Sequence, residues 1–238
     1  MKGLVIIPTY NELENVPLIV PEILKQDKEL DVLIVDDGSP DGTGAKVKEM
    51  MTKNKRLHIL EREKKSGLGR AYIAGFRWSL ENGYDYVIEM DADFSHDPNE
   101  LHLLIEAMRN GRDAVFGSRY IGGVRVLNWD MKRLILSAMG NSYARFATGV
   151  KLTDLTGGYN LYTRKVLEGL NLDRITSNGY SFQIEMKSKS VFKKFSVEEV
   201  PIIFRDRSHG STKMSGGIVN EALFKCWRIR FDKWFKKY

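Results

Sequence analysis

Cysteine is almost missing from this sequence, because Cys226 is the only one among 238 residues. One thiol cannot form an intramolecular disulfide, which excludes the small cross-linked scaffolds of secreted proteins. Long apolar runs are missing too: each is short and broken by charges, whereas roughly 18 to 20 consecutive apolar residues are needed to span a bilayer. The first residues lead directly into Gly3–Pro8 without the pattern of a signal peptide. We expect a cytoplasmic protein that touches a membrane without crossing it.

The sequence also lacks low-complexity tracts, internal repeats and Gly/Ser linkers, so nothing divides it into separate folding units. Its length suits one large core with appendages. The net charge of +6 and the isoelectric point near 9.2 favour an anionic partner: a phosphorylated substrate, an acidic lipid surface or a nucleic acid. The basic excess gathers near the C-terminus, where Asp232 is the one acid among the cations Lys225, Arg228, Arg230, Lys233, Lys236 and Lys237.

Short aliphatic runs alternate with amphipathic stretches along the first half of the chain. The runs are bounded by turn residues and predict buried strands over Leu4–Pro8, Val32–Asp36, Leu57–Leu60, Tyr86–Asp91 and Ala114–Gly117. Helical spacing predicts helices over Leu13–Lys25, Asp41–Lys53, Leu68–Leu80 and Pro98–Asn110. This alternation is typical of an α/β fold in which helices cover both faces of a mostly parallel sheet.

The second half of the chain is less regular. Its pattern predicts helices over Met131–Ala147 and near Phe182–Val191, a loop through Thr153–Gly158 and a strand over Val197–Phe204. We interpret this half as the acceptor-binding side of the same domain.

Polar sequences follow three of the predicted strands at the point where each strand ends. They are Pro8-Thr-Tyr-Asn-Glu12, Asp36-Asp-Gly-Ser-Pro-Asp41 and Asp91-Ala-Asp93. Ligands of open parallel sheets bind outside the carboxyl ends of the strands, so we expect these sequences to meet at one edge of the sheet.

Asp91 and Asp93 come at the end of an apolar strand, where both carboxylates can reach one divalent cation. Oxygen ligands favour Mg²⁺ or Mn²⁺, which keep positions open for diphosphate oxygens. Taken alone, an Asp-x-Asp sequence is equally typical of a solvated turn. A calcium loop of the EF-hand type is excluded, because its required glycine and glutamate are His96 and His102 here.

The acidic pair Asp36 and Asp37 precedes small, turn-forming residues that let a ligand approach the backbone. We expect Asp37 to contact the base or the ribose of a nucleotide. A helix-capping turn formed by Ser39 or Asp41 is the structural alternative, and the two interpretations are compatible.

Two other patterns suggest sites and carry less weight. Gly67-Leu-Gly69 is similar to a dinucleotide fingerprint, but Tyr72 stands where the third glycine belongs, so the sequence predicts a helix start near a phosphate. His96 and His209 have no partner at zinc-like spacing, and we interpret both as polar loop residues.

Several motifs, in a fixed order along the chain, carry a resemblance to a known family. They are Val5-Ile-Ile-Pro-Thr-Tyr-Asn-Glu12, Val35-Asp-Asp-Gly-Ser-Pro-Asp-Gly-Thr43, Met90-Asp-Ala-Asp93, Gly117-Ser-Arg-Tyr120 and Asp154-Leu-Thr-Gly157. Together they resemble the inverting family-two glycosyltransferases with the GT-A fold, and more narrowly the dolichyl and polyprenyl phosphate mannosyltransferases. The sequences at 128–133, 200–207 and 210–213 also match, so the resemblance covers residues 3 to 225.

The resemblance assigns roles to individual residues. It implies that the nucleoside of the donor is held by Pro8, Tyr10, Glu12, Val35 and Asp37. It implies that metal and diphosphate lie among Asp91, Ala92 and Asp93, and that the donor phosphates meet Arg207 and Lys213. The implied acceptor-phosphate residues are Arg119, Arg133 and Ser137. Some relatives carry a metal-binding glutamine at the position of Ser95, where we expect a water molecule.

The reaction that the resemblance implies is inverting transfer of mannose from GDP-mannose to dolichyl or polyprenyl phosphate. A phosphate monoester has a second pKa of about 6, so the acceptor is largely dianionic at neutral pH and needs no general base. The protein must align two anions and neutralise the departing diphosphate. We therefore expect catalysis by a metal held at Asp91 and Asp93 and by Arg119, whose planar fork suits phosphate.

From Val219 onward, large apolar residues recur at helical spacing: Leu223, Trp227, Phe231, Trp234 and Tyr238. Lys225, Arg228 and Lys236 lie on the other side of such a helix. The pattern predicts a basic amphipathic helix at residues 219–238, after a catalytic domain at residues 1–218, that attaches the protein peripherally to a membrane. Docking on its own domain, on a membrane protein or on a second copy in a homo-oligomer is the alternative.

Other functions fit parts of the sequence. An enzyme of the same fold that uses UDP-glucose or another nucleotide sugar fits the first half equally, and the regions of Trp129 and Asp154 favour mannose by resemblance. A processive polysaccharide synthase is disfavoured, since Ala74 stands where the glutamine of its Gln-x-x-Arg-Trp motif belongs. A nucleic-acid-binding module would leave the acidic strand ends unexplained, so we expect no nucleic-acid partner.

Overall fold

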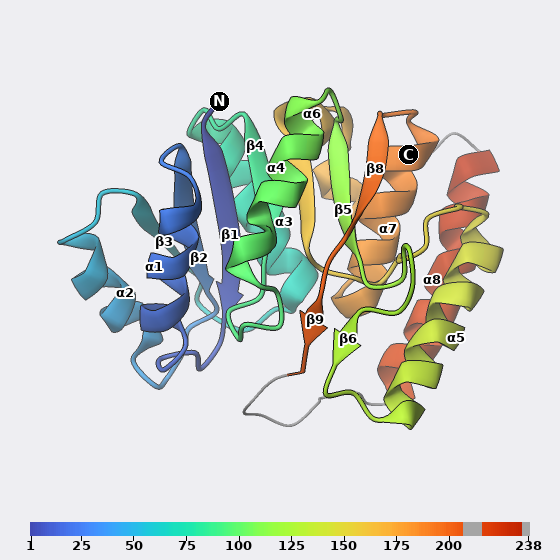
Figure 1. Ribbon diagram of the computed structural model, residues 1–238, viewed down its shortest axis with the longest axis horizontal. Helices are drawn as coiled ribbons and strands as arrows, with labels where there is room; N and C mark the ends of the chain where they lie inside the picture. The colour runs from blue at the N-terminus through green and yellow to red at the C-terminus, as the bar shows by residue number, and fades with distance from the viewer. Residues whose placement is uncertain (207–215, 235–238) are drawn as a thin grey trace.

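The computed structural model describes residues 1–206 and 216–234, with the backbone alone for residues 216–223. Figure 1 shows a central sheet with helices on both faces. The sheet has seven strands in the order β3-β2-β1-β4-β7-β5-β8. These strands are β1 (Gly3–Thr9), β2 (Leu30–Asp36), β3 (Leu57–Glu61), β4 (Tyr86–Glu89), β5 (Ala114–Ser118), β7 (Asn160–Thr163) and β8 (Val197–Pro201). A small second sheet pairs β6 (Val126–Leu127) with β9 (Phe204–Arg205).

The helices divide between the two faces of the sheet. One face is covered by α1 (Val16–Gln26), α2 (Thr43–Met51) and α4 (Leu101–Arg109). The other is covered by α3 (Leu68–Glu81), α6 (Arg164–Gly169) and α7 (Gly179–Phe192), with α8 (Gly216–Trp234) beside α7 and α5 (Met131–Thr148) beside α8. Short 3₁₀ helices occur at Pro98–Glu100 and Leu172–Arg174.

The alternation of side chains along β1 explains why both faces carry helices. Leu4 and Ile6 enter one apolar cluster, whereas Val5 and Ile7 enter the cluster on the opposite face. All four are fully buried. A strand buried on both faces needs a continuous apolar run, and that run made β1 predictable from sequence.

β7 is the one antiparallel strand of the main sheet and lies between β4 and β5. Its first residue, Asn160, pairs with Glu89 on one side and with Phe116 on the other. The loop before β7 therefore crosses the carboxyl ends of β4 and β5. The predicted α/β class with a mostly parallel sheet is confirmed, but β7 was not predicted because its short, mixed-polarity sequence gives no strand signal.

Helix α8 docks on the domain and keeps its aromatic side chains outside. Cys226 and Ile229 are buried in the same core cluster as residues of α5 and α7. Trp227, Phe231 and Trp234 of the predicted stripe are exposed, while Leu223 and Tyr238 lie outside the described side chains. A narrow face of the helix therefore packs on its own domain, as the alternative interpretation expected, and the aromatic face is open. Attachment to a membrane stays a prediction. Within the described ranges, no helix has the length and apolarity to cross a bilayer.

The docking of α8 predicts an unreactive thiol. Burial raises the pKa of Cys226 to about 11, and the thiolate is the form that reacts with alkylating agents. At pH 8 we expect native Cys226 to react with iodoacetamide on the order of 100-fold more slowly than an ordinary cysteine. Mass spectrometry of timed samples, with guanidinium-unfolded protein as the fast control, measures this. Equal rates in both samples would show that α8 does not stay docked.

Candidate active site

The polar strand ends gather along one edge of the sheet, as predicted. β1, β2 and β4 are parallel to one another, and β5 has the same direction because β7 runs antiparallel to both β4 and β5. In Figure 1 this edge lies at the bottom, where the arrow of β1 ends and where β6 and β9 also lie. The candidate site is built along this edge.

The residues expected to hold a nucleoside lie at the ends of β1 and β2. Pro8 pairs with Val35 across the two strands. The Val35 side chain is fully buried in the core, so only its backbone is available to a ligand. Tyr10 is partly exposed, and the Lys65 ammonium lies 4.1 Å from the centre of its ring. Glu12 accepts a 2.7 Å hydrogen bond from the Asn15 side chain.

The two carboxylates of the acidic pair after β2 have different hydrogen-bond partners. Asp36 is fully engaged in the turn, since it accepts hydrogen bonds from the Thr9 hydroxyl and from the backbone and hydroxyl of Ser39. Asp37 instead accepts from Arg62 at 2.8 Å. Burial raises the pKa of Asp37 above its ordinary value, although the Arg62 charge opposes that rise. Asp37 also accepts the backbone N–H of Ser66 at 3.4 Å, so its shorter hydrogen bond is the one to a side chain.

The helix-capping alternative is also present in the structure. Asp41 accepts hydrogen bonds from the backbone and hydroxyl of Thr43, the first residue of α2, and from the backbone of Leu13. The Ser39 hydroxyl accepts from the backbone of Asn11. The turn therefore joins the loop after β1 to the start of α2, and it fixes the position of the residues expected to hold a nucleoside.

Asp91 and Asp93 come just after β4, beyond Met90, and are both partly exposed, with Ala92 buried between them. Asp93 accepts a 3.0 Å hydrogen bond from the backbone of Ser95. The Ser95 hydroxyl is buried and has no hydrogen-bond partner among the described residues. The segment thus forms a tight turn that presents two carboxylates beside an unsatisfied hydroxyl.

His96 is buried, which corrects its interpretation as a polar loop residue. Its side chain is 1% exposed and stacks on Tyr159 at a centroid distance of 4.9 Å. Burial lowers the pKa of His96 to about 4, so the ring is neutral at pH 7. Its Nδ1 accepts the backbone N–H of Asp91 at 3.2 Å, and this bond fixes the turn that carries the carboxylates.

Arg119 follows β5 and is held in a buried ion pair. Its Nε and Nη2 donate to the two carboxylate oxygens of Asp154 at 2.7 and 2.8 Å, and Nη2 also donates to Thr156. Burial alone would raise the pKa of Asp154, but the guanidinium outweighs burial and holds that pKa well below its usual range. Arg119 is thus a fixed cation and not a solvated surface charge.

Aromatic rings join the Asp91 turn to the Arg119 ion pair. The ring of Phe204 lies edge-on to His96 at 5.5 Å, and the Arg119 guanidinium lies 5.5 Å from the same ring. The charges of Asp93 and Arg119 both act on the pKa of His96, with opposite signs. The paired acids and the fixed cation therefore belong to one site.

Arg133 and Ser137 lie in the first half of α5, near the same site. Arg133 stacks on Trp129 at 4.4 Å and forms a 2.6 Å ion pair with Asp206. The Ser137 hydroxyl accepts a 2.7 Å hydrogen bond from Tyr120, the neighbour of Arg119. The three expected acceptor residues thus come together, while Arg207 and Lys213 lie outside the described residues.

Comparison with known proteins shows the family to which the chain belongs. The model of glycosyl transferase family 2 matches residues 4–170, well over half of the chain. The chain belongs to glycosyl transferase family 2. It is therefore a glycosyltransferase, as the motifs predicted.

Two known proteins are similar to this chain over nearly its whole length. Polyprenol monophosphomannose synthase of Mycolicibacterium smegmatis is 49% identical, over 96% of this chain and 88% of the relative. Undecaprenyl-phosphate mannosyltransferase of Micrococcus luteus is 46% identical, over 96% of this chain and 93% of the relative. These relatives confirm the narrower resemblance, to polyprenyl phosphate mannosyltransferases, that the motifs indicated.

Solved structures share the fold of this chain at low identity. Glucosyl-3-phosphoglycerate synthase from Mycobacterium tuberculosis in complex with phosphoglyceric acid superposes with a TM-score of 0.72 at 16% identity, covering 97% of this chain and 80% of that one. Its complex with Mn²⁺, UDP-glucose and phosphoglyceric acid gives a TM-score of 0.69 at 17% identity, covering 94% and 79%. These likenesses confirm the predicted GT-A fold.

The family-two site also rests on buried polar residues that the sequence did not reveal. Asn160 donates to Glu89 at 2.8 Å and to the Gly157 carbonyl at 3.1 Å, which ties β4 to the loop before β7. Burial raises the pKa of Glu89 to about 8. Lys187 of α7 donates to the Asp154 carbonyl at 2.8 Å, and burial lowers its pKa to about 8. No motif signals these residues, because their role depends on contacts distant in sequence.

Proposed function

We propose that this family-two enzyme transfers mannose from GDP-mannose to a polyprenyl or dolichyl phosphate at a membrane surface, with Mg²⁺ or Mn²⁺ as cofactor. The observation that supports it most is the meeting of two partly exposed carboxylates, Asp91 and Asp93, with the fixed cation of Arg119. The sugar and the lipid acceptor follow the names of the two relatives that are nearly half identical.

The residues present fit a divalent cation. The two carboxylates supply hard oxygen ligands, and the orphaned hydroxyl of Ser95 marks a polar position beside them that suits a bound water. Among the residues described, no three histidine, cysteine or acidic side chains form a closed metal cage. A cation held by Asp91 and Asp93 would thus keep open positions, and when bound it neutralises charge on the departing diphosphate.

The chain's own cations suit the acceptor. A dianionic phosphate needs positioning and charge neutralisation, not deprotonation. Arg119 is fixed by Asp154 through Nε and Nη2, which leaves Nη1 as the nitrogen to meet a phosphate oxygen. Arg133 and Ser137 supply further donors from α5. Attack by the held phosphate on the sugar, opposite the departing diphosphate, inverts the anomeric centre.

The test of this function is product formation. The purified protein is incubated with Mn²⁺ or Mg²⁺, a polyprenyl phosphate and one of several radiolabelled nucleotide sugars, and the label is followed into an organic extract. We expect a labelled lipid from GDP-mannose that forms only with metal. A lipid product from UDP-glucose alone would show that UDP-glucose, not GDP-mannose, is the donor. The absence of a labelled lipid with every donor would reject the proposal.

Attachment through α8 gives a separate prediction. Trp227, Phe231 and Trp234 are exposed, so replacing all three by serine should leave the fold intact. Vesicle binding should fall at least about tenfold, because each aromatic side chain would bury apolar surface in the membrane interface. Co-sedimentation with phosphatidylcholine vesicles measures this. Truncation is a poorer test, because it would also remove Cys226 and Ile229 from the core. Binding equal to that of the unaltered chain would contradict the prediction.

A further inference from the structure

Helix α5 exposes an apolar stripe of its own. Met131, Ile135, Met139 and Phe146 are 67%, 52%, 64% and 71% exposed, and their spacing along the helix places them on one side. Isolated exposed apolar residues are ordinary, but several along one side of a helix mark a surface that is covered in use. The opposite side of α5 packs on the domain through Ala144 and Ala147.

The α5 stripe continues onto α8. The two helices lie side by side at the end of the molecule away from α2 and β3, as Figure 1 shows. The rings of Phe146 and Trp227 meet edge-on at 6.2 Å and join the two rows. Phe224, 86% exposed, extends the same surface. We call the exposed apolar side chains of α5 and α8 the α5/α8 face.

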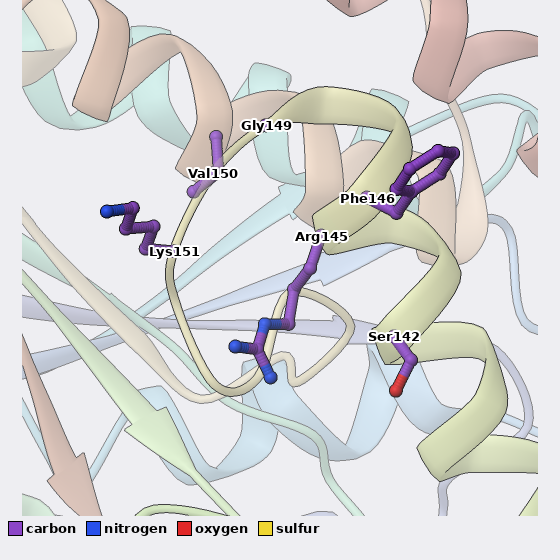
Figure 2. Close-up of a pocket in the computed structure, with 6 residues that line it drawn as sticks. All are labelled: Ser142, Arg145, Phe146, Gly149, Val150 and Lys151. Atoms are coloured by element: carbon purple, nitrogen blue, oxygen red, sulfur yellow. The ribbon is translucent and has the colours of Figure 1, made fainter.

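A cleft of about 380 Å³ opens at the end of the α5 row. It is lined by Ser142, Arg145, Phe146, Gly149, Val150 and Lys151. Figure 2 shows Arg145 reaching from α5 under the curve of the following loop, which carries Lys151. The lining thus includes two cations and a hydroxyl, and none of the lining residues carries a carboxylate. The cleft lies at the far end of α5 from Arg133 and Ser137, so it is not the acceptor site.

The end of a helix would ordinarily repel an anion, because its free carbonyl groups carry partial negative charge. Arg230 of α8 removes this obstacle. Its Nη1 donates to the carbonyl of Phe146 at 3.0 Å and to that of Ala147 at 3.4 Å. Arg230 also lies close to Gly149 of the cleft. The positive charges of Arg145, Lys151 and Arg230 thus exceed the partial negative charge at the end of α5, and the cleft attracts an anion.

We propose that α5 lies on the bilayer beside α8 and that this cleft receives the phosphate of an anionic phospholipid headgroup. The α5 stripe enters the interfacial layer, where Arg145 and Lys151 reach the headgroup phosphates at the rim of the apolar surface. The 18 residues of α5 span about 27 Å, so one helix has the headgroup cleft at one end and the acceptor residues at the other. The inference deepens the proposed function and rests on it for the lipid nature of the acceptor.

Two double variants separate the apolar and the charged contributions. In the first, Met139→Ser and Phe146→Ser remove apolar side chains; in the second, Arg145→Gln and Lys151→Gln remove the charges. Lys53→Gln with Lys55→Gln is the matched control, because both lysines are exposed near α2 and β3 at the opposite end of the molecule. Co-sedimentation uses vesicles of phosphatidylcholine alone or mixed with phosphatidylglycerol.

We expect the apolar variant to lose binding to both kinds of vesicle. The charge variant should bind neutral vesicles like the unaltered chain and lose affinity for anionic ones by about fivefold for each cation removed. The control should lose less than the charge variant. Unchanged binding of the apolar variant, or equal losses in the charge variant and the control, would overturn the proposal. Loss of inorganic phosphate binding by the charge variant in solution, with unchanged binding of that variant to anionic vesicles, would instead assign the cleft to a free anion.

The result of the vesicle assay does not depend on the proposed function, because the assay contains neither nucleotide sugar nor polyprenyl phosphate. A water-soluble short-chain acceptor phosphate provides the complementary readout, since all the variants should turn it over at the unaltered rate. If the variants lose vesicle binding but the sugar comes from a donor other than GDP-mannose, this inference stands and the proposed function is rejected. A dimer in solution that the apolar variant dissociates would instead assign the α5/α8 face to a second copy.

Discussion

Replacing Asp93 by asparagine should reduce metal-dependent turnover by at least about 1,000-fold. The change removes one of the two carboxylates proposed to hold the cation, and charge neutralisation by a metal contributes several kcal/mol to such a transition state. The fold should persist, because the asparagine carbonyl can still accept the backbone N–H of Ser95, the 3.0 Å bond that Asp93 makes. The measurement is kcat with GDP-mannose across a range of Mn²⁺ concentrations.

Asp97 provides a matched control four residues further along the chain. Its carboxylate accepts the backbone N–H of Asn99 at 2.9 Å, in the same turn geometry as Asp93 with Ser95. Asp97→Asn should therefore keep near-normal turnover. Activity of Asp93→Asn within tenfold of that control would remove the metal site from the account.

Replacing Asp154 by asparagine should give the largest loss of stability. The carboxylate is fully buried and holds the Arg119 guanidinium through two hydrogen bonds, so the change leaves a buried cation without its counter-charge. Breaking such a pair costs about 3–5 kcal/mol. For a chain of this size the midpoint of thermal unfolding should fall on the order of 10 °C. Turnover below that midpoint should fall as well, because Arg119 loses its fixed orientation.

A surface ion pair and the pH dependence make this prediction specific. Glu198→Gln breaks the exposed pair with Arg112 and should cost less than about 1 kcal/mol. The pKa of Asp154 is lowered in the folded state, so its stabilisation is present above the ordinary Asp pKa of about 4 and is lost as the pH falls below it. The difference in the free energy of unfolding between the unaltered chain and Asp154→Asn should be constant from about pH 5 to 8 and shrink in acid. A difference that grew in acid would contradict the ion-pair explanation.

The first half of the fold was predictable because its information is local. Each buried strand of the parallel part is a short apolar run, as β1 shows, and each ends in polar residues. The carboxyl ends of parallel strands must share an edge, so the position of Asp37, Asp91 and Asp93 along one edge of the sheet followed from topology. The helix start at Gly67 followed from glycine spacing, and α3 begins at Leu68.

The rest of the site depends on contacts that no local pattern encodes. β7 is short, and Asn160 acquires its role only when the strand lies between β4 and β5. His96 looks like a loop residue, and its burial becomes visible only with Tyr159 and Phe204 packed against it. The aromatic face of α8 likewise points outward because Cys226 and Ile229, on the other side of the helix, pack in the core. The individual roles of the donor and acceptor residues stay predictions.

The most direct measurement of the central claim is the electron paramagnetic resonance signal of free Mn²⁺ during titration with GDP. If Asp91 and Asp93 hold the cation together with the nucleotide diphosphate, the free signal should fall when GDP is added to the unaltered chain and to Asp97→Asn. It should fall no further than in protein-free solution for Asp93→Asn. A fall in Asp93→Asn equal to that of the unaltered chain would show that the cation and the diphosphate meet elsewhere.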